Sequence, residues 1–375
     1  MNVHMNVKPS AFTRFAAYSK NHKAWNQDGF IEAFLKQTRK SSTMKDVARL
    51  AGVSIQTVSA VVNNKPDITA ETRARVLAAV KQLNYQPDLV ARSLRTRQTK
   101  TIALVVSNIA SIAIATMAKA AEEQAHSFGY RLVLYNTHND VERETNYFKA
   151  AVQQWVDGVI FIAAMGRLGR IDILQAADIP VVAIDRIPDD YNGPAVMLDN
   201  LKAGRLAGEH LLDLGHRRLA HIGGPLGIRL ARERLVGFQQ AIEVRGLEPG
   251  ACAVENGTLF TCQQGYLAMQ RLLTQQPQPP TAVFAANDLM AIGAMRAVDE
   301  AGLRVPEDIS IVGMDDIEVA AFQVPPLTTV RQPCAELATL GVQFLLDILA
   351  GKELAQTQMV IEPSLIVRRS TTCLV

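Results

Sequence analysis

The feature that most constrains the fold is residues 44–63, where the sequence reads MKDVARLAGVSIQTVSAVVN. Apolar residues recur at helical spacing on both sides of Gly52, which accepts the positive φ at which a helix often ends. Ser54 then stands where the N-cap of a second helix is expected. We therefore predict two short helices joined by a glycine turn. A third helix, opening at Thr69, would close a small core with Val76, Leu77, Val80 and Leu83.

The second predicted helix has one face for packing and one face for contact with a partner. Val58, Val61 and Val62 fall on the packing face, which turns outward Ile55, Gln56, Ser59, Ala60 and Asn63. Such a face fits the major groove of DNA, although an ordinary helical hairpin has the same outline. We predict base readout by Ile55 and Gln56, because a glutamine amide pairs well with adenine. The predicted phosphate contacts are Ser54, Thr57 and Asn63.

Short motifs extend this pattern in a fixed order: DVA at 46–48, GVS at 52–54, TVS at 57–59, LNYQP at 83–87 and ARSL at 91–94. Together they resemble the lactose-repressor/galactose-repressor family of bacterial transcription regulators, over roughly residues 44–372. The resemblance implies a helix-turn-helix DNA-binding domain at 44–87, followed by a hinge helix at 88–99. Further DNA contacts would then come from Tyr85, Ala91, Arg92, Leu94 and Arg95.

Leu94, in the segment 88–99, and Ala60 affect how such a protein would bind its operator. Taken alone, 88–99 is too short for a stable helix and reads as a solvated linker. In similar proteins, however, a leucine at the position of Leu94 wedges into the minor groove and bends the duplex. Ala60 stands where many members carry arginine. We expect the operator to differ at that base pair, because alanine offers at most a methyl contact to thymine.

Charge is distributed unevenly along the 375 residues. Residues 1–43 contain 7 Lys and Arg against 2 Asp and Glu, residues 44–100 contain 10 against 4, and the remainder contains 22 against 30. Residues 1–100 are thus basic and the remainder is acidic, a distribution that fits binding of DNA phosphates by the N-terminal part. We predict that 1–43 is a mobile basic extension, either an arm that adds nonspecific DNA affinity or an upstream start before Met44.

After Thr101, apolar runs alternate with amphipathic segments, and this alternation predicts an α/β fold with parallel sheets. The predicted strands are Ile102–Val106, Arg131–Leu134, Gly158–Ile162, Val181–Ile184, Arg218–Ile222, Thr281–Ala285 and Ser310–Met314. The predicted helices lie near Met117–Phe128, Glu142–Trp155, Leu201–Leu214, Arg232–Val244 and Leu289–Ala301. We expect two doubly wound lobes, roughly 100–198 and 199–328, with crossovers near 328–332 and in the C-terminal segment. The resemblance assigns them to the periplasmic-binding-protein type.

Polar residues follow several of these strands, at the edge where open α/β sheets bind ligands. Asp185 follows a strand of the first lobe, and Asn287 with Asp288 follows a strand of the second. A carboxylate there accepts paired hydrogen bonds from vicinal hydroxyls, and Asp288 is the leading candidate. Arg234 resembles the family arginine that binds a sugar or acid ligand. The alternative for Arg234 is a surface ion pair with Glu233 or a neighbouring residue.

Two further residues complete the predicted ligand site, and one segment departs from the family. Gln332 lies at the final crossover, and Phe260 would stack on a sugar ring unless it is a core aromatic. Similar proteins commonly carry Asn-Pro-Phe-Phe after the first strand, whereas this chain has Ser111–Ile114, with the sequence SIAI. We therefore expect a smaller, more polar or differently oriented effector than a stacked pyranose.

Other motifs favour structural interpretations. His210, His216 and His221 match no metal-binding spacing, and the four cysteines contain no C-x-x-C pair. The glycines at 223–224 favour a tight turn over a phosphate cradle, since no P-loop lysine accompanies them. The acidic pair at 315–316 occurs in the family without catalysis. We predict no metal, no cofactor and no catalytic site, because nothing assembles a nucleophile, a base and an oxyanion site.

These observations predict a sequence-specific transcription regulator, most consistent with a repressor of carbohydrate-utilisation genes. It would bind a palindromic operator as a homodimer, with reader helices roughly 34 Å apart. A sugar, sugar acid or sugar phosphate in the cleft between the lobes would be its effector. A solute-binding protein and a sugar-processing enzyme are the alternatives. The chain has no 18-residue apolar run and no secretory segment, so we expect a cytoplasmic protein without a membrane partner.

Overall fold

The computed structural model describes residues 42–85, 98–248, 252–275 and 278–374. The chain divides into two units, Met1–Arg92 and Ser93–Val375, and each is described by itself. The predicted extension at 1–43 and hinge helix at 88–99 lie outside the described residues, except at their ends. The same holds for four predicted DNA contacts, namely Ala91, Arg92, Leu94 and Arg95.

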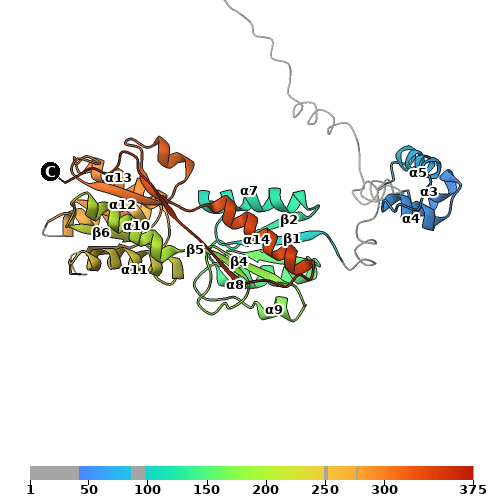
Figure 1. The fold of residues 1–375 in the computed structure, drawn as a ribbon, viewed down its shortest axis with the longest axis horizontal. Coiled ribbons are helices and arrows are strands. Elements are labelled where there is room, and N and C mark those ends of the chain that lie inside the picture. The colour runs from blue at the N-terminus through green and yellow to red at the C-terminus, as the bar shows by residue number, and fades with distance from the viewer. Residues whose placement is uncertain (1–41, 86–97, 249–251, 276–277, 375) are drawn as a thin grey trace, which may run out of the picture. The chain divides into compact units, whose positions relative to one another are not determined.

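The first unit contains the three helices that the sequence predicts (Figure 1), namely α3 (Met44–Ala51), α4 (Ile55–Val62) and α5 (Ala70–Gln82). Gly52 ends α3 in the left-handed conformation, with φ 64°. Ser54 caps α4 by accepting a hydrogen bond from the Thr57 backbone N–H at 3.1 Å. Thr43 and Asp46 form a capping box at the start of α3. Local sequence signals therefore define each boundary of this helical turn.

The core of this head is small and apolar, and one prediction about it is wrong. Val47, Val58 and Val76 are fully buried between the three helices. Leu77 does not join them, because 51% of its surface remains exposed. Tyr85, predicted to contact DNA, is only 8% exposed and packs in this core. Its side chain therefore contributes to the packing of the head.

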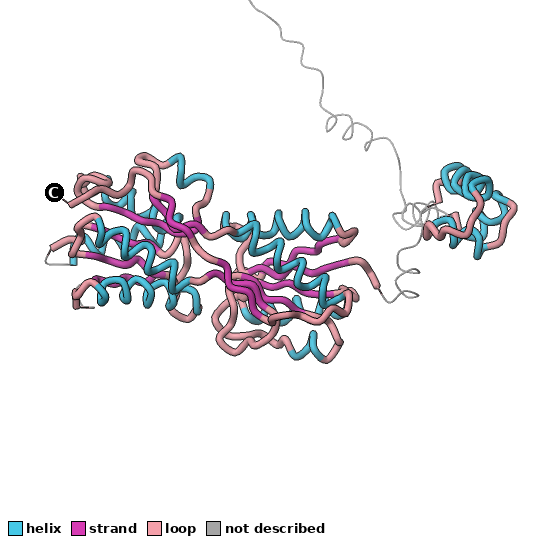
Figure 2. The backbone as a smooth tube through the Cα atoms, viewed as in Figure 1, coloured by secondary structure: helices cyan, strands magenta, loops and turns pink. Residues whose placement is uncertain are grey.

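The second unit contains two six-stranded sheets flanked by helices on both faces (Figures 1 and 2). The first sheet has the order β11-β5-β4-β3-β1-β2, and all its pairs are parallel. Its strands are β1 (Thr101–Val106), β2 (Arg131–Asn136), β3 (Gly158–Phe161), β4 (Val181–Ile184), β5 (Ala195–Leu198) and β11 (Gln358–Ile361). Its helices are α7 (Ile112–Ser127), α8 (Val141–Gln153), α9 (Asp172–Gln175) and α14 (Cys334–Leu349). The central strands β1, β3 and β4 are buried throughout, as parallel strands covered on both faces should be.

The second sheet repeats this plan, with the order β12-β10-β9-β8-β6-β7. Its strands are β6 (Leu219–Gly223), β7 (Cys252–Asn256), β8 (Ala282–Ala285), β9 (Ser310–Asp315), β10 (Thr328–Arg331) and β12 (Ser364–Ile366). Its helices are α10 (Asn200–Asp213), α11 (Arg229–Val244), α12 (Cys262–Gln275), α13 (Asp288–Glu300) and the 3-10 helix η2 (Glu318–Phe322). The edge strand β12 is antiparallel to β10. The α/β fold with two parallel-sheet lobes is thus confirmed.

The residues after β10 divide between the two sheets, which extends the predicted lobe bounds of roughly 100–198 and 199–328. After β10 the chain returns to the first lobe, where α14 packs against α7 and β4 in the apolar core. It adds β11 beside β5 and then crosses back to place β12 beside β10. We therefore define the first lobe as residues 98–198 and 332–361, and the second lobe as 199–331 and 362–374. Three crossing segments join them.

Candidate functional site

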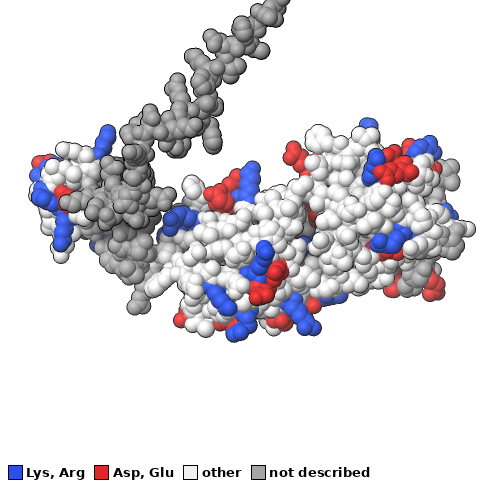
Figure 3. All heavy atoms as spheres, turned by 180° about the vertical axis from the view of Figure 1, so that it is seen from behind, with Lys and Arg blue, Asp and Glu red and all other residues white. Residues whose placement is uncertain are grey.

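The exposed side of α4 is the candidate DNA-binding surface. Ile55 and Gln56 are exposed at the start of the helix, whereas Val58 and Val61 on the opposite side are buried. Ser59 and Ala60 are half-buried beside them. Asn63, a predicted phosphate contact, donates from its amide to the Ser59 carbonyl oxygen at 2.6 Å and so closes the end of α4. Residues 42–85 carry six Lys and Arg against three Asp and Glu, and basic side chains are visible on this unit in Figure 3.

A chain of hydrogen bonds joins the two lobes and forms the candidate ligand site. Gln332, in the second crossover, donates from Nε2 to Asp185 Oδ1 of the first lobe at 2.6 Å. Its Oε1 accepts a hydrogen bond from Arg234 Nη2 of the second lobe at 3.1 Å. All three side chains are buried. The sequence placed them on separate elements, and the fold brings them together at the carboxyl ends of the two sheets.

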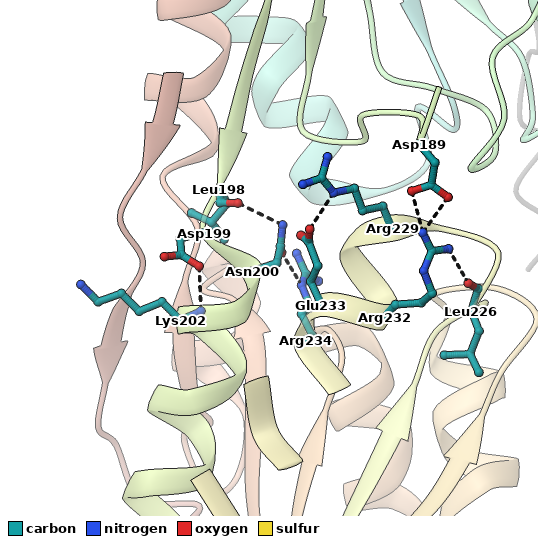
Figure 4. A network of polar contacts seen from close by, with 10 residues as sticks. All are labelled: Asp189, Leu198, Asp199, Asn200, Lys202, Leu226, Arg229, Arg232, Glu233 and Arg234. Atoms are coloured by element: carbon teal, nitrogen blue, oxygen red, sulfur yellow. Dashed lines mark hydrogen bonds and ion pairs between the residues drawn. The ribbon is translucent and has the colours of Figure 1, made fainter. Parts of the chain in front are cut away.

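The Arg234 guanidinium is held by the protein on every side. Arg234 lies in the middle of α11, which begins at Arg229, three residues earlier than predicted. Nε donates to Asn200 Oδ1 at 2.9 Å, as Figure 4 shows, and Nη1 donates to the Ala286 carbonyl oxygen at 2.7 Å. Glu233 does not pair with it, because Glu233 accepts from Arg229 Nε at 2.6 Å. The surface ion pair considered as an alternative is therefore excluded.

Two residues that were not predicted as ligand contacts also line this pocket. Asp315 ends β9, and its Oδ1 lies 4.0 Å from Arg234 Nη1. Burial raises the pKa of Asp315 well above its usual value, and the charge of Arg234 acts in the opposite direction. Arg186 follows Asp185 directly, and burial lowers its pKa. Asp315 met the same criterion as Asp185, a carboxylate at the end of a strand, but was set aside as one of an acidic pair.

The backbone at both strand ends is unusual. Asp185 has φ 61° and Asp315 has φ 115°, a range that few residues other than glycine adopt. Such conformations persist only where the surrounding structure holds them, and they cluster at functional sites. Here they aim one carboxylate from each sheet at the same buried space.

Asp288, the leading candidate from sequence, lies outside the pocket. It is fully buried as the first residue of α13. Its Oδ1 accepts from Thr329 Oγ1 at 2.6 Å, and its Oδ2 accepts from the Ile317 backbone N–H at 2.9 Å. Burial raises the pKa of Asp288 to about 7. We therefore correct its role: it ties α13 to β10 and η2 within the second lobe.

The remaining pocket residues come from both lobes. Asn287 caps α13 through a hydrogen bond from the Met290 backbone N–H at 2.9 Å, and it also lines the pocket. The Phe260 ring lies 5.3 Å from the Arg186 guanidinium, in a cation–π contact. Gly224 makes room for that ring, since a Cβ there would lie 2.2 Å from Phe260 Cε1. The Ser111–Ile114 segment also reaches the pocket, through Ser111, Ala113 and Ile114.

The space among these side chains is small, about 30 Å³. Two arginines and two aspartates surround it, namely Arg186, Arg234, Asp185 and Asp315, so that their formal charges balance. Small-molecule pockets measure about 300 Å³ or more. A sugar-sized ligand therefore requires the lobes or the lining side chains to move apart.

The histidines have structural surroundings. His216 is buried and contacts Thr281 Oγ1 and Ser310 Oγ at 3.0 and 3.1 Å. His221 is fully buried in a cluster with the rings of Phe238 and Phe284, and neither ring nitrogen has a hydrogen-bond partner among the described residues. Within those residues no three His, Cys, Asp or Glu side chains are arranged to hold a metal ion. No helix in the described part of the chain is long and apolar enough to cross a membrane.

Comparison with known proteins identifies relatives of both units. The profile of bacterial regulatory proteins of the lacI family matches residues 43–88, and that of the periplasmic binding protein-like domain matches residues 209–371. The HTH-type transcriptional repressor PurR of Pasteurella multocida is 38% identical, over 88% of this chain and 98% of its own length. The ribose operon repressor of Escherichia coli K12 is also 38% identical, over 88% of this chain and 99% of its own length.

A solved structure supports the same grouping. The lac repressor dimer bound to operator and the anti-inducer ONPF matches with a TM-score of 0.81 and 33% identity. The match covers 89% of this chain and 100% of that chain. These relatives are repressors, and they support neither the solute-binding protein nor the sugar-processing enzyme that the sequence left as alternatives.

Proposed function

This chain belongs to the LacI family of bacterial regulatory proteins and is a DNA-binding transcriptional repressor rather than an enzyme, and we propose that a small carbohydrate bound between its lobes controls it. The observation that carries the proposal is the hydrogen-bonded chain Asp185–Gln332–Arg234. It links both lobes at the carboxyl edges of their sheets, where open α/β folds bind ligands. A ligand that interacts differently with the open and closed arrangements would shift the balance between them.

The polar groups around the pocket favour a neutral sugar over a sugar acid or sugar phosphate. Three nitrogens of Arg234 already donate to the protein. An anionic ligand would have to displace these contacts, whereas the carboxylates and amides of the pocket suit the hydroxyls of a neutral sugar. The lining residues proposed to contact it are Asp185, Arg186, Arg234, Phe260, Asn287, Asp315 and Gln332.

On the DNA side, we propose that Ile55 and Gln56 read bases in the major groove and that Ser54, Thr57, Ser59 and Asn63 contact phosphates. The exposure of the start of α4 supports the first part. The family position of Leu94, outside the described residues, supports a minor-groove wedge, with Ala91, Arg92 and Arg95 of the proposed hinge segment 88–99 beside it. The basic extension 1–43 would add sequence-independent affinity. Because operator DNA is chromosomal, we place the protein in the cytoplasm.

Operator binding by this protein is proposed to require a homodimer. A groove of about 880 Å³ lies on the second lobe beside α12 and α13, and Phe322 and Val324 near it are 76% and 94% exposed. An exposed apolar surface of this kind is typical of an interface. A second copy of the chain would cover it. Analytical ultracentrifugation should show a dimer for the natural chain and monomers for Val324→Asp.

The ligand proposal is tested by thermal unfolding of the full chain with neutral sugars, sugar acids, sugar phosphates and purines. A ligand at 100 times its Kd adds about 2.7 kcal/mol, which raises Tm by a few degrees. We expect a neutral sugar to do so, and Asp185→Asn and Gln332→Ala to abolish the shift. A shift that survives both substitutions would place the ligand elsewhere. Asp288→Asn is the comparison variant, which should alter Tm without selectively removing the ligand-induced shift.

A further inference from the structure

The two lobes also meet at the mouth of the cleft, away from the crossing segments. Asp189, in the first-lobe loop after β4, faces Arg232 on α11 of the second lobe (Figure 4). Arg232 Nη2 donates to both carboxylate oxygens of Asp189 at 2.6 Å, and Nη1 donates to the Leu226 carbonyl oxygen at 2.8 Å. The two charged side chains remain 38% and 52% exposed. An exposed pair of this kind is weak and is screened by salt, so it opens readily.

A second contact at the mouth depends on the absence of a side chain. A Cβ on Gly166 of the first lobe would lie 1.7 Å from the Gly227 carbonyl oxygen of the second lobe. Neither glycine has a positive φ, so backbone freedom does not explain the requirement at 166. The Asp189 backbone N–H donates to the Gly166 carbonyl oxygen at 3.2 Å, which ties the two first-lobe segments together. The backbones of the two lobes can therefore meet only if residue 166 is glycine.

Position 227, on the other side of the contact, can accept a side chain. No atom lies within 4 Å of the position that a Cβ would take on Gly227. The two glycines thus face each other across the mouth, but only Gly166 points its open side at the other lobe. Gly166→Ala and Gly227→Ala are therefore a matched pair of variants. Each adds one methyl group at the same contact, but only the first should disturb it.

We propose that Gly166, Asp189, Gly227 and Arg232 form a mouth latch, which holds the lobes closed over the polar pocket and must open for a ligand to enter or leave. The pocket behind it, about 30 Å³, is too small for a ligand in the latched arrangement. The strength of the latch therefore sets the share of closed molecules before any effector binds, and with it the apparent affinity for the effector. This role rests on the proposed function of the cleft.

The test measures the distance between the lobes in the full chain by pulsed electron paramagnetic resonance. The exposed Cys262 and Cys373 are first replaced by serine, and Lys149→Cys on α8 and Val244→Cys at the end of α11 then carry one spin label each. Labelled protein is diluted with unlabelled chain, so that distances between subunits do not contribute. The measurement uses neither DNA nor ligand. Its failure would leave the ligand proposal intact, whereas failure of the ligand screen would leave the closing contact intact and remove only its role in ligand entry.

We expect Gly166→Ala to shift most molecules to a longer distance, and Gly227→Ala to leave the distribution of the parent protein unchanged. Arg232→Gln and Asp189→Asn should each lower the ratio of closed to open molecules about two- to fivefold, as should 1 M salt on the parent. Salt should have no such effect on Arg232→Gln. If Gly166→Ala does not fold, the charge variants and salt decide. Identical distributions for the parent and all the latch variants would overturn the proposal.

Discussion

The start of α4 and the pocket between the lobes differ in how their polar side chains are held. Ile55 and Gln56 extend from the surface of a three-helix unit whose stability depends on valines behind them. Arg234 and Gln332 are buried and form hydrogen bonds with other groups of the protein. A surface reader can therefore change its specificity at little cost in stability, whereas the pocket cannot change one residue without disturbing its neighbours.

Removal of the Arg234 charge should have the largest effect on stability. Arg234→Met leaves Asn200 Oδ1, the Ala286 carbonyl oxygen and Gln332 Oε1 without their donor, and it leaves Asp315 buried without its counter-charge. Breaking such a buried pair costs about 3–5 kcal/mol. We expect that loss in the free energy of unfolding by urea. Arg205→Met, at an exposed position of α10, is the matched control and should change it by less than about 0.5 kcal/mol. Equal effects of both variants would remove the distinction drawn above.

Gln56→Ala should show the opposite behaviour. We expect base discrimination at one operator position to fall by about 1–3 kcal/mol, because a paired contact to a base is lost. The free energy of unfolding should stay within about 0.5 kcal/mol of the parent, since the side chain is exposed. Selection from a randomised operator library measures the first quantity. Leu77→Ala, exposed on α5, is the control and should leave base preference intact. Unchanged preference in Gln56→Ala would exclude base readout by this residue.

The pH dependence of stability should also differ between the two regions. Burial lowers the pKa of His221 to about 3, while an unfolded histidine titrates near 6.5. The unfolded chain therefore binds the proton first, and the stability that His221 contributes falls as the pH drops from about 6.5 towards 3, whereas Asp288, whose pKa burial raises to about 7, acts in the opposite direction. Between pH 7 and 5 we expect His221 alone to account for a loss of about 2 kcal/mol. The head at 44–87 contains no histidine and should not share this effect.

The measurement is the urea unfolding free energy of the second-unit transition at several pH values. His221→Leu keeps a similar volume in the cluster with Phe238 and Phe284. Relative to the parent, its unfolding free energy should lack a loss of about 2 kcal/mol between pH 7 and pH 5. Parallel curves for parent and variant would show that another group is responsible.

Local sequence signals account for what could be predicted about these two regions. Gly52 and Ser54 define the helical turn because each acts within four residues of its own position. Asp185, Arg234 and Gln332 were predicted from the general rule that ligands bind at the carboxyl ends of parallel strands. The periodicity also located most strands of both sheets to within one or two residues.

The predictions failed where contacts between distant segments determine the structure. Asp288 looked like a ligand residue, but Thr329 and Ile317, about thirty to forty residues away, occupy its carboxylate. The strands β5, β7, β11 and β12 and the helices α9, α12, α14 and η2 were not predicted. The return of α14 to the first lobe depends on packing against α7, about 220 residues earlier. The burial of Tyr85 could not be predicted for the same reason, because it depends on three helices that only the tertiary fold assembles.

Substitution of Ser54 should have a smaller effect, and it should alter both the stability of α4 and the binding of DNA. Ser54 Oγ accepts the Thr57 backbone N–H and lies 2.9 Å from Thr57 Oγ1, in a hydrogen bond in which either hydroxyl can be the donor. When Thr57 donates, the Ser54 hydroxyl hydrogen can reach a phosphate. Ser54→Ala should destabilise α4 by about 1 kcal/mol, whereas Ser54→Gly should cost only a few tenths. Hydrogen exchange of the α4 amides measures this difference. Both variants should weaken operator binding alike if the hydroxyl contacts a phosphate. If Ser54→Gly binds as tightly as the parent, the residue acts as a cap alone, and Ser54 belongs with the structural residues of the head.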